Sequence, residues 1–432
     1  MMKKAILSIA AFAVSAVLLA GPTTPKTATQ KAAQEADKSG PLAESVWGFC
    51  AVNLQGDTLA WLNAGRRMLP ASNMKLITTG AALLTFGGNH TFQTTLAFRP
   101  RLEKYEVPGP VAVDSVLRAD LYVVGGGDPM IGNLFSYMPK VDVTFGKWLK
   151  VLEDNGIKVI DGDVVGDGSA FLGELRHTDW STEDVRTRDG VVPSGLTWRG
   201  KMGDPIPDGP YPAVLHFKEW LKTHSDISIT GKAREGHADS LTVLGSVNSL
   251  PLRSLVRTAN CMSDNFIAET LLKALGDRYY NDETYSRSIS ALHRALSQLG
   301  LMSESGQMRF ADGSGLSRKN YVSPAFMVKY LKAMTGSRVY DDFLASLPYA
   351  GEKGTTLERR LPGADASLKK RIRMKSGSMN GTRCFSGYIL PGDGVPQHAI
   401  VFSILTNNAV ASNADTYAVI DSLVEALAKE NK

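Results

Sequence analysis

The sequence predicts an α+β fold: an antiparallel sheet flanked by helices, interrupted by a separate α+β insert. Three observations support this prediction. Strand-like runs occur near both ends of the chain, and helical periodicity dominates much of the last half. Between about residues 91 and 212, strand-like runs alternate with Gly/Asp turns, as expected for an insert of different character.

The first part of the sheet is predicted just after the N-terminal region. Residues 45–53 and 58–62 alternate like strands around the turn Gln55-Gly56-Asp57, which predicts a hairpin. Pro70-Ala71-Ser72 then opens a helix that ends at Gly87-Gly88.

The elements of the insert and of the C-terminal part are predicted from the same kinds of sequence pattern. In the insert, residues 121–124 and 159–166 are predicted strands and residues 143–155 a helix, whereas residues 186–212 are rich in Gly, Pro and Asp and are predicted loop. Beyond it, apolar residues at helical spacing predict helices that end at Gly276 and Gly300. The last predicted elements are strands at 371–375, 384–390 and 398–406, and a final helix.

The N-terminus has the pattern of a secretory signal. Lys3 and Lys4 precede the apolar run 5–20, which is short for a membrane span, and small residues follow it. We therefore expect a signal peptide over 1–20 and an extracytoplasmic, periplasmic protein with no integral membrane span after cleavage. Residues 21–40 lack aromatics and predict a flexible tether. The predicted catalytic domain then comprises 41–90 and 213–432, with accessory insertion over 91–212.

Composition and charge exclude several classes of protein. With 43% hydrophobic and 21% charged residues, the chain is an ordinary globular protein. The net charge of +5 is mild, and the basic cluster at 369–371 has no accompanying aromatic stripe, so no nucleic-acid partner is expected. Histidine spacing predicts no metal site, and no cofactor is expected. Cys50, Cys261 and Cys384 allow at most one disulfide, whose pairing the sequence leaves open.

Three short motifs carry the predicted chemistry. They are Ser72-Asn73-Met74-Lys75, Ser263-Asp264-Asn265 and Lys375-Ser376-Gly377-Ser378. Each is weak alone, but their order and local context are those of serine enzymes that recognise penicillin.

Each residue type suits a step of acyl transfer. Ser72, at a helix start, is the predicted nucleophile, and Lys75, three residues on, shares its helix face and can take its proton. Lys375 adds positive potential that lowers the pKa of Lys75, so that a neutral Lys75 is available to accept the proton, and it helps attract a substrate carboxylate. The remaining roles are proton relay for Ser263, amide binding for Asn265, carboxylate binding for Ser376, and close approach of a substrate strand at Gly377. The backbone N–H groups of Ser72 and Ser378 are the candidates for the oxyanion hole.

The chain resembles the D-alanyl-D-alanine carboxypeptidase/endopeptidase family, the class C low-molecular-mass penicillin-binding proteins. The matching blocks run from the first hairpin to the last sheet: residues 69–76, 121–129, 160–165, 263–269, 312–317, 354–357 and 375–381. The resemblance implies a penicillin-binding, serine β-lactamase-like transpeptidase domain that cleaves D-alanyl peptide bonds in peptidoglycan stem peptides and cross-links. It also implies acylation of Ser72 by β-lactams.

The resemblance has departures and alternatives. Ser376 stands where the family usually has Thr, and the insert looks short, so a second accessory domain is in question. In this family the insert supplies an acidic residue that binds the amino group of the stem-peptide diamino acid, and Asp184 is the candidate here. Two other functions remain open: a cell-wall scaffold with a decayed site, and a β-lactamase.

Overall fold

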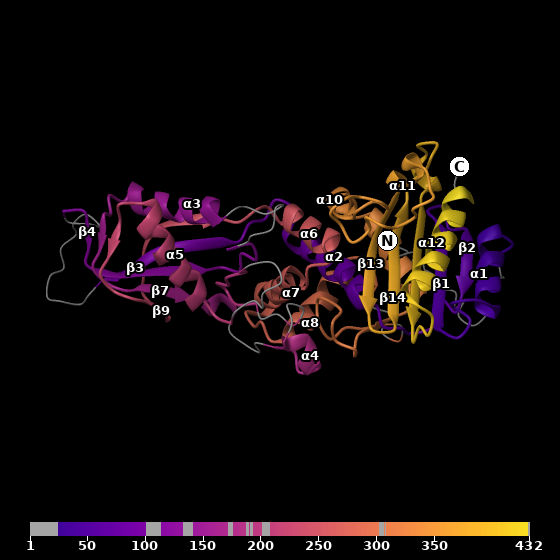
Figure 1. Ribbon diagram of the computed structural model, residues 1–432, viewed down its shortest axis with the longest axis horizontal. Coiled ribbons are helices and arrows are strands. Elements are labelled where there is room, and N and C mark those ends of the chain that lie inside the picture. Colours follow the sequence, from indigo (N-terminus) through magenta and orange to yellow (C-terminus); the bar gives the residue numbers. More distant parts are fainter. Residues whose placement is uncertain are drawn as a thin grey trace, which may run out of the picture.

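The computed structural model describes residues 25–100, 114–132, 141–171, 176–186, 190, 193–200, 208–301, 306 and 308–430. The predicted signal peptide over 1–20 therefore lies outside the described residues. The molecule is elongated, with one sheet near each end and a group of helices between them (Figure 1). This arrangement places the insert at the end opposite α12.

The first sheet has five antiparallel strands, and it joins the two ends of the chain. Its order is β13-β14-β15-β1-β2, with bounds Ile372–Met379, Thr382–Ile389, Ile400–Asn407, Val46–Asn53 and Thr58–Leu62. The predicted hairpin and the three C-terminal strands are thus present. Strand β1 pairs with β15 from Val46↔Asn407 to Asn53↔Ile400, which closes the sheet across the whole sequence. Strand β13 forms an edge of this sheet.

Both faces of the sheet's centre are covered, which explains why β14 and β15 are buried along their whole length. The Phe385 ring faces Tyr417 of α12 (Asn413–Glu430), with ring centroids 5.8 Å apart. On the opposite face, the Tyr388 hydroxyl donates to the carbonyl of Leu331 in α9 (Pro324–Thr335) at 2.8 Å. Since side chains alternate along a strand, one strand anchors a helix on each face.

The middle of the molecule is helical, and only some of its helices were predicted from the sequence. The helices are α2 (Met74–Phe86), α6 (Leu252–Cys261), α7 (Asn265–Tyr280), α8 (Tyr285–Ser297), α10 (Tyr340–Ser346) and α11 (Ala366–Arg371), with the small hairpin β11 (Met308–Arg309) and β12 (Tyr321–Val322). A 3-10 turn, η1 (Ala71–Asn73), precedes α2, and another, η4 (Pro396–His398), precedes β15. No helix among the described residues is long and apolar enough to cross a bilayer.

The insert is built on a second five-stranded sheet of mixed direction. Its order is β10-β3-β5-β7-β9, with bounds Thr242–Asn248, Gln93–Pro100, Ala119–Gly125, Val164–Asp167 and Ala233–Glu235. A three-stranded parallel sheet, β4-β6-β8, accompanies it at Val116–Leu117, Val159–Ile160 and Ser228–Ile229. The 3-10 turn η2 covers Ser169–Phe171.

The insert extends farther along the chain than predicted. Helix α5 (Tyr211–His224) shares a core with α3 (Val141–Asp154), where Phe217 lies against Phe145 at 5.2 Å and Trp148 at 5.0 Å between ring centroids. Strand β10 then pairs with β3. The predicted end at residue 212 is therefore too early, because helical periodicity does not reveal which sheet a helix covers.

The predicted flexible tether over 21–40 is wrong for most of its described part. Residues 28–38 form helix α1 (Ala28–Lys38), capped by the Thr27 side chain. Gln30 is buried and pairs with the backbone of Trp61 in edge strand β2, accepting from its N–H at 2.7 Å and donating to its carbonyl at 3.3 Å. Thr29 N–H donates to Glu430 at the end of α12. Polar composition suggested disorder, but here polar side chains satisfy the exposed edge of a sheet.

Replacing Gln30 with Ala should lower the free energy of unfolding by about 1–3 kcal/mol, because the Trp61 backbone groups lose their partners. Chemical denaturation measures this effect. Gln34→Ala in the same helix is the control and should stay near the parent protein. Equal stability of both variants would contradict the conclusion that Gln30 stabilises the docking of α1 on strand β2.

Candidate active site

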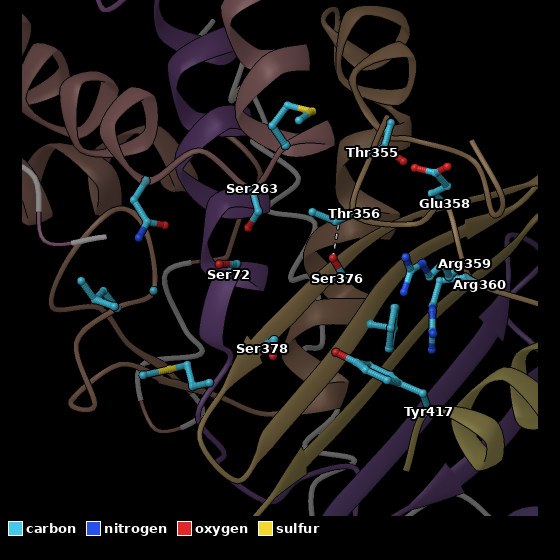
Figure 2. Close-up of a pocket in the computed structure, with 16 residues that line it drawn as sticks. Ser72, Ser263, Thr355, Thr356, Glu358, Arg359, Arg360, Ser376, Ser378 and Tyr417 are labelled. Carbon is cyan, nitrogen blue, oxygen red and sulfur yellow. Dashed lines mark hydrogen bonds between the residues drawn. The ribbon is translucent and has the colours of Figure 1, made fainter. Parts of the chain in front are cut away.

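A cavity of about 530 Å³ opens between the helical region and edge strand β13. Members of all three predicted motifs line it: Ser72, Ser263, Asn265, Ser376 and Ser378. Figure 2 shows Ser72, Ser263, Ser376 and Ser378 grouped together, with Arg359, Arg360 and Tyr417 farther along the same cavity. Tertiary folding thus brings together residues that are far apart in the sequence.

Ser72 lies on the 3-10 turn η1, and the α-helix begins two residues later, at Met74. The preceding Ala71 has a left-handed backbone with φ of 44°. A non-glycine residue in this conformation costs on the order of 1–3 kcal/mol and persists only where its surroundings impose it. The strain marks a sharp turn that presents Ser72 at the start of a buried helix.

The ammonium of Lys75 joins the first motif to two other segments. Its Nζ lies 2.9 Å from Ser72 Oγ, 2.7 Å from Asn265 Oδ1 and 2.7 Å from the carbonyl oxygen of Ser314. Lys75 is fully buried. The predicted pairing of Ser72 with Lys75 is therefore present in hydrogen-bonding geometry, as a nucleophile and its base require.

The second motif forms the entry to helix α7. Asp264 is the N-cap, and its carboxylate accepts from the N–H of Ile267 at 2.9 Å. Asn265 begins the helix, and Ser263 has a left-handed φ of 57°. The turn directs Ser263 into the cavity beside Ser72, while Asn265 contacts Lys75.

Lys375 on β13 is a second buried lysine. Burial and the nearby Lys75 ammonium hold the pKa of Lys375 well below its usual range. Its Nζ donates to the carbonyl of Ser376 at 2.6 Å, and the Ser376 hydroxyl donates to Thr356 Oγ1 at 2.8 Å. Lys375 is not among the residues that line the cavity, although its neighbour Ser376 is.

Gly377 lies against the turn that carries Ser72. A Cβ at this position would lie 2.8 Å from Pro70 O, 3.1 Å from Ser72 N and 3.2 Å from Asn73 N. The missing side chain therefore leaves room for the Ser72 turn, while the predicted approach of a substrate strand at Gly377 stays a prediction. This close approach brings the Ser72 backbone next to β13, which also carries Ser378.

Two buried acidic residues, Glu269 and Asp312, fix the loop whose Ser314 carbonyl accepts from Lys75. Glu269 of α7 accepts hydrogen bonds from Gly313 N at 3.1 Å and Ser314 N at 2.7 Å, so it holds the loop whose Ser314 carbonyl accepts from Lys75. Burial, with the neighbouring Asp312 carboxylate, raises the pKa of Glu269 to about 7. Asp312 accepts from Gly315 N and from Trp180 Nε1, both at 2.8 Å. Neither acid is among the site residues predicted from the sequence.

The far wall of the cavity was also missed as a site by sequence reasoning. It is lined by Thr355, Thr356, Glu358, Arg359, Arg360 and Tyr417. Arg360 is over the Tyr417 ring, 4.1 Å from its centroid, and lies 3.4 Å from the Asp421 carboxylate. The block 354–357 was noted only as part of the resemblance. Nothing in the sequence alone indicated that residues around 360 and 417 face the same space.

Asp184 does not line this cavity. It belongs to the short helix α4 (Thr182–Arg186), where its carboxylate accepts from the Ser181 hydroxyl at 2.6 Å and its own N–H donates back to Ser181 Oγ at 3.1 Å. This reciprocal pair is a helix cap. The geometry explains Asp184 as a local structural residue and gives the predicted substrate contact no support.

The cysteines and possible metal ligands complete the inventory of reactive groups. Cys50, Cys261 and Cys384 are all buried free thiols. Burial raises the pKa of Cys50 and of Cys384 to about 12, so both stay protonated. In the described part of the chain, no group of His, Cys, Asp or Glu side chains is arranged to hold a metal ion.

A sequence profile of the D-Ala-D-Ala carboxypeptidase 3 (S13) family matches residues 28–202 and 214–430, nearly all of the described chain. The chain belongs to this family. Membership confirms the family, the enzyme class and the α+β penicillin-binding fold that the sequence predicted. The three motifs therefore lie in a serine-type D-Ala-D-Ala carboxypeptidase.

Individual relatives agree with the family. The chain is 26% identical over 457 residues to the D-alanyl-D-alanine carboxypeptidase of Actinomadura sp. (strain R39), covering 87% of this chain and 79% of that one. Penicillin binding protein 4 (dacB) from Haemophilus influenzae has a similar structure, with a TM-score of 0.74 and 21% identity over 92% of this chain and 98% of that one. That protein has also been solved in complex with a β-lactam.

A third similar structure is Bd3459, a predatory peptidoglycan endopeptidase from Bdellovibrio bacteriovorus. Its TM-score is 0.57, with 16% identity over 90% of this chain and 94% of that one. At these identities the two solved structures show the shared fold.

Gly377→Ala should slow acylation by penicillin about tenfold or more, because the added methyl group pushes β13 away from the Ser72 turn. Stopped-flow or gel-based acylation kinetics measure this. Gly146→Ala is the matched control, since a Cβ at 146 meets no atom within 4 Å. Normal acylation of the Gly377→Ala variant would contradict the close approach.

Glu269→Gln should change how stability depends on pH. A folded-state pKa raised from the ordinary 4.5 to about 7 means that the folded protein keeps this proton longer than the unfolded chain. As the pH rises from about 5 to about 7, the free energy of unfolding of the parent protein therefore falls by up to about 3 kcal/mol. The Glu269→Gln variant should lack this fall. Unfolding midpoints measured across that range test this, with exposed Glu35→Gln as control. A pH-independent difference between Glu269→Gln and the parent would refute it.

Proposed function

We propose that this enzyme cleaves the terminal D-Ala-D-Ala bond of peptidoglycan stem peptides through an acyl-enzyme on Ser72. One observation carries the proposal: the 2.9 Å contact between Lys75 Nζ and Ser72 Oγ at the floor of a cavity lined by the other two motifs. Acyl transfer needs a nucleophile, a base within hydrogen-bonding reach and donors for the oxyanion, and candidates for all three are present.

In the acylation step, neutral Lys75 takes the proton of Ser72 as Oγ attacks the carbonyl carbon of the penultimate D-Ala. Two buried ammonium groups resist being charged together, and the lowered pKa of Lys375 is consistent with a pair that holds fewer than two protons. The oxyanion of the tetrahedral intermediate accepts from the backbone N–H groups of Ser72 and Ser378. Such preorganised donors are worth several kcal/mol, roughly 3–4 for one donor.

Collapse of this intermediate breaks the peptide bond and leaves an ester on Ser72. Ser263 relays a proton to the departing amine of the terminal D-Ala, while Asn265 binds the substrate backbone amide. The hydroxyls of Ser376 and Ser378 bind the terminal carboxylate, which the potential of Lys375 attracts. A water molecule, deprotonated by the same base, then attacks the ester carbonyl and releases the shortened peptide and Ser72.

The same chemistry supports two further activities. D-alanyl cross-links present the same acyl group with a different amine, so endopeptidase activity is the second expected reaction. β-Lactams present a strained amide and a carboxylate, and we expect them to acylate Ser72. These reactions belong outside the cytoplasm, in line with the signal-like residues 1–20.

Two alternative functions lack a supporting observation. A scaffold with a decayed site does not require the intact set of Ser72, Lys75, Ser263, Asn265 and Lys375. A β-lactamase requires fast hydrolysis of the penicillin ester, and the long insert between the first two motifs is not typical of simple β-lactamases.

Ser72→Ala should abolish labelling by a fluorescent penicillin and cleavage of a D-Ala-D-Ala stem peptide while leaving the unfolding midpoint nearly unchanged. Intact-mass spectrometry with peptide mapping places the adduct in the parent protein, and Ser367→Ala, an exposed N-terminal residue of α11, is the control. Undiminished labelling of Ser72→Ala would refute the nucleophile. Rapid drug hydrolysis without a lasting adduct on the parent protein would favour the β-lactamase.

A further inference from the structure

Arg199 connects the insert to the catalytic region. Its backbone belongs to the insert, because its N–H donates to the carbonyl of Ile131 at 3.0 Å. The adjacent Trp198 stacks on Phe145 of α3, with ring centroids 5.6 Å apart. The Arg199 side chain leaves this core and reaches the motif that begins helix α7.

The side chain ends in a two-point ion pair with Asp264. Nη2 lies 2.6 Å from Oδ2 and Nη1 lies 3.3 Å from Oδ1. Both side chains are almost fully buried, with 1% and 9% of their surface exposed. The guanidinium also covers the ring of Phe266, 4.7 Å from its centroid. Two parallel contacts and a stacked face fix the carboxylate in orientation as well as in position.

Asp264 stands between two residues whose placement the proposed reaction needs. Ser263 faces the cavity with a strained, left-handed φ of 57°. Asn265 accepts from Lys75 at 2.7 Å. Strained residues persist only where surrounding contacts impose their conformation, and the Arg199 ion pair is such a contact.

A gain in folding stability does not by itself explain the ion pair between Arg199 and Asp264. Removing two charges from water costs free energy that their attraction often fails to repay, so a buried ion pair is weak evidence for a gain in stability. A hydrophobic pair would fill the same space without orienting the motif.

We propose that Arg199 is a positioning residue: through Asp264, the insert sets the geometry of Ser263 and Asn265 in the active site. Arg199 does not contact substrate. The inference rests on the proposed function of the Ser263 motif, and it gives the insert a direct part in acylation.

The test compares acylation by penicillin in three variants of the full-length protein. Arg199→Met should slow acylation by about tenfold to a hundredfold, because the motif loses its orientation. Arg199→Lys should lie between Arg199→Met and the parent, since a single ammonium cannot make the two-point contact. Arg234→Met is the control: Arg234 pairs with Asp120 and Asp163 within the insert, and this variant should acylate at the parental rate.

A double-mutant cycle separates positioning from a general structural role. If Arg199 acts through Asp264, then Arg199→Met should have little further effect in an Asp264→Asn background. Parental acylation by folded Arg199→Met, even with a lowered unfolding midpoint, would overturn the inference. So would an equal slowing in both backgrounds. If Arg199→Met does not fold, Arg199→Lys replaces it in the cycle.

The same data distinguish this inference from the proposed function. A parent protein that penicillin does not acylate would refute the proposed function. A parent protein that is acylated, with Arg199 variants that match it, would refute the inference alone.

Discussion

The site depends on the hydrogen bonds of the buried Lys75 ammonium. It joins Ser72, Asn265 and the Ser314 carbonyl, which come from three separate segments of the chain. A lysine removed from water needs such partners, and other residues fix the position of the partners. Glu269 accepts a hydrogen bond from the loop that carries Ser314. The sheet edge can lie close to Ser72 because Gly377 has no side chain.

Burial of several charged groups in one region explains the electrostatics of the site. Lys375 and Glu269 both have pKa values shifted toward their neutral forms, and burial is the largest cause in each case. After burial, the Lys75 ammonium adds to the lowering of the Lys375 pKa, and the Asp312 carboxylate adds to the raising of the Glu269 pKa. Where an extra positive charge is costly, a larger fraction of a lysine is neutral, and only a neutral lysine can accept a proton. The burial that shifts these pKa values also costs folding free energy.

The insert is part of the catalytic structure rather than an appended module. Trp180 donates to Asp312, and Arg199 pairs with Asp264 at the start of helix α7. Both contacts are buried and directional, and they reach two of the segments that meet at Lys75. Strands β3 to β10 and helices α3 and α5 form the insert's own core, whereas Trp180 from a connecting segment belongs to the core of the catalytic region.

The fold class, the family and the three motifs can be recognised from the sequence, because the residues of each motif lie close together along the chain. Strand β2 and helices α7, α8 and α12 were also predicted, whereas α6, α9, α10 and α11 were not. The extent of the insert, the docking of α1, the capping role of Asp184 and the contacts of Glu269 and Arg199 became evident from the structure. These features depend on which distant segments of the chain meet in space. Periodicity predicts which side chains are buried, but not which segment they pack against. The polar residues of 28–38 show the limit most clearly, since composition alone could not reveal that Gln30 would pair with the edge of a sheet.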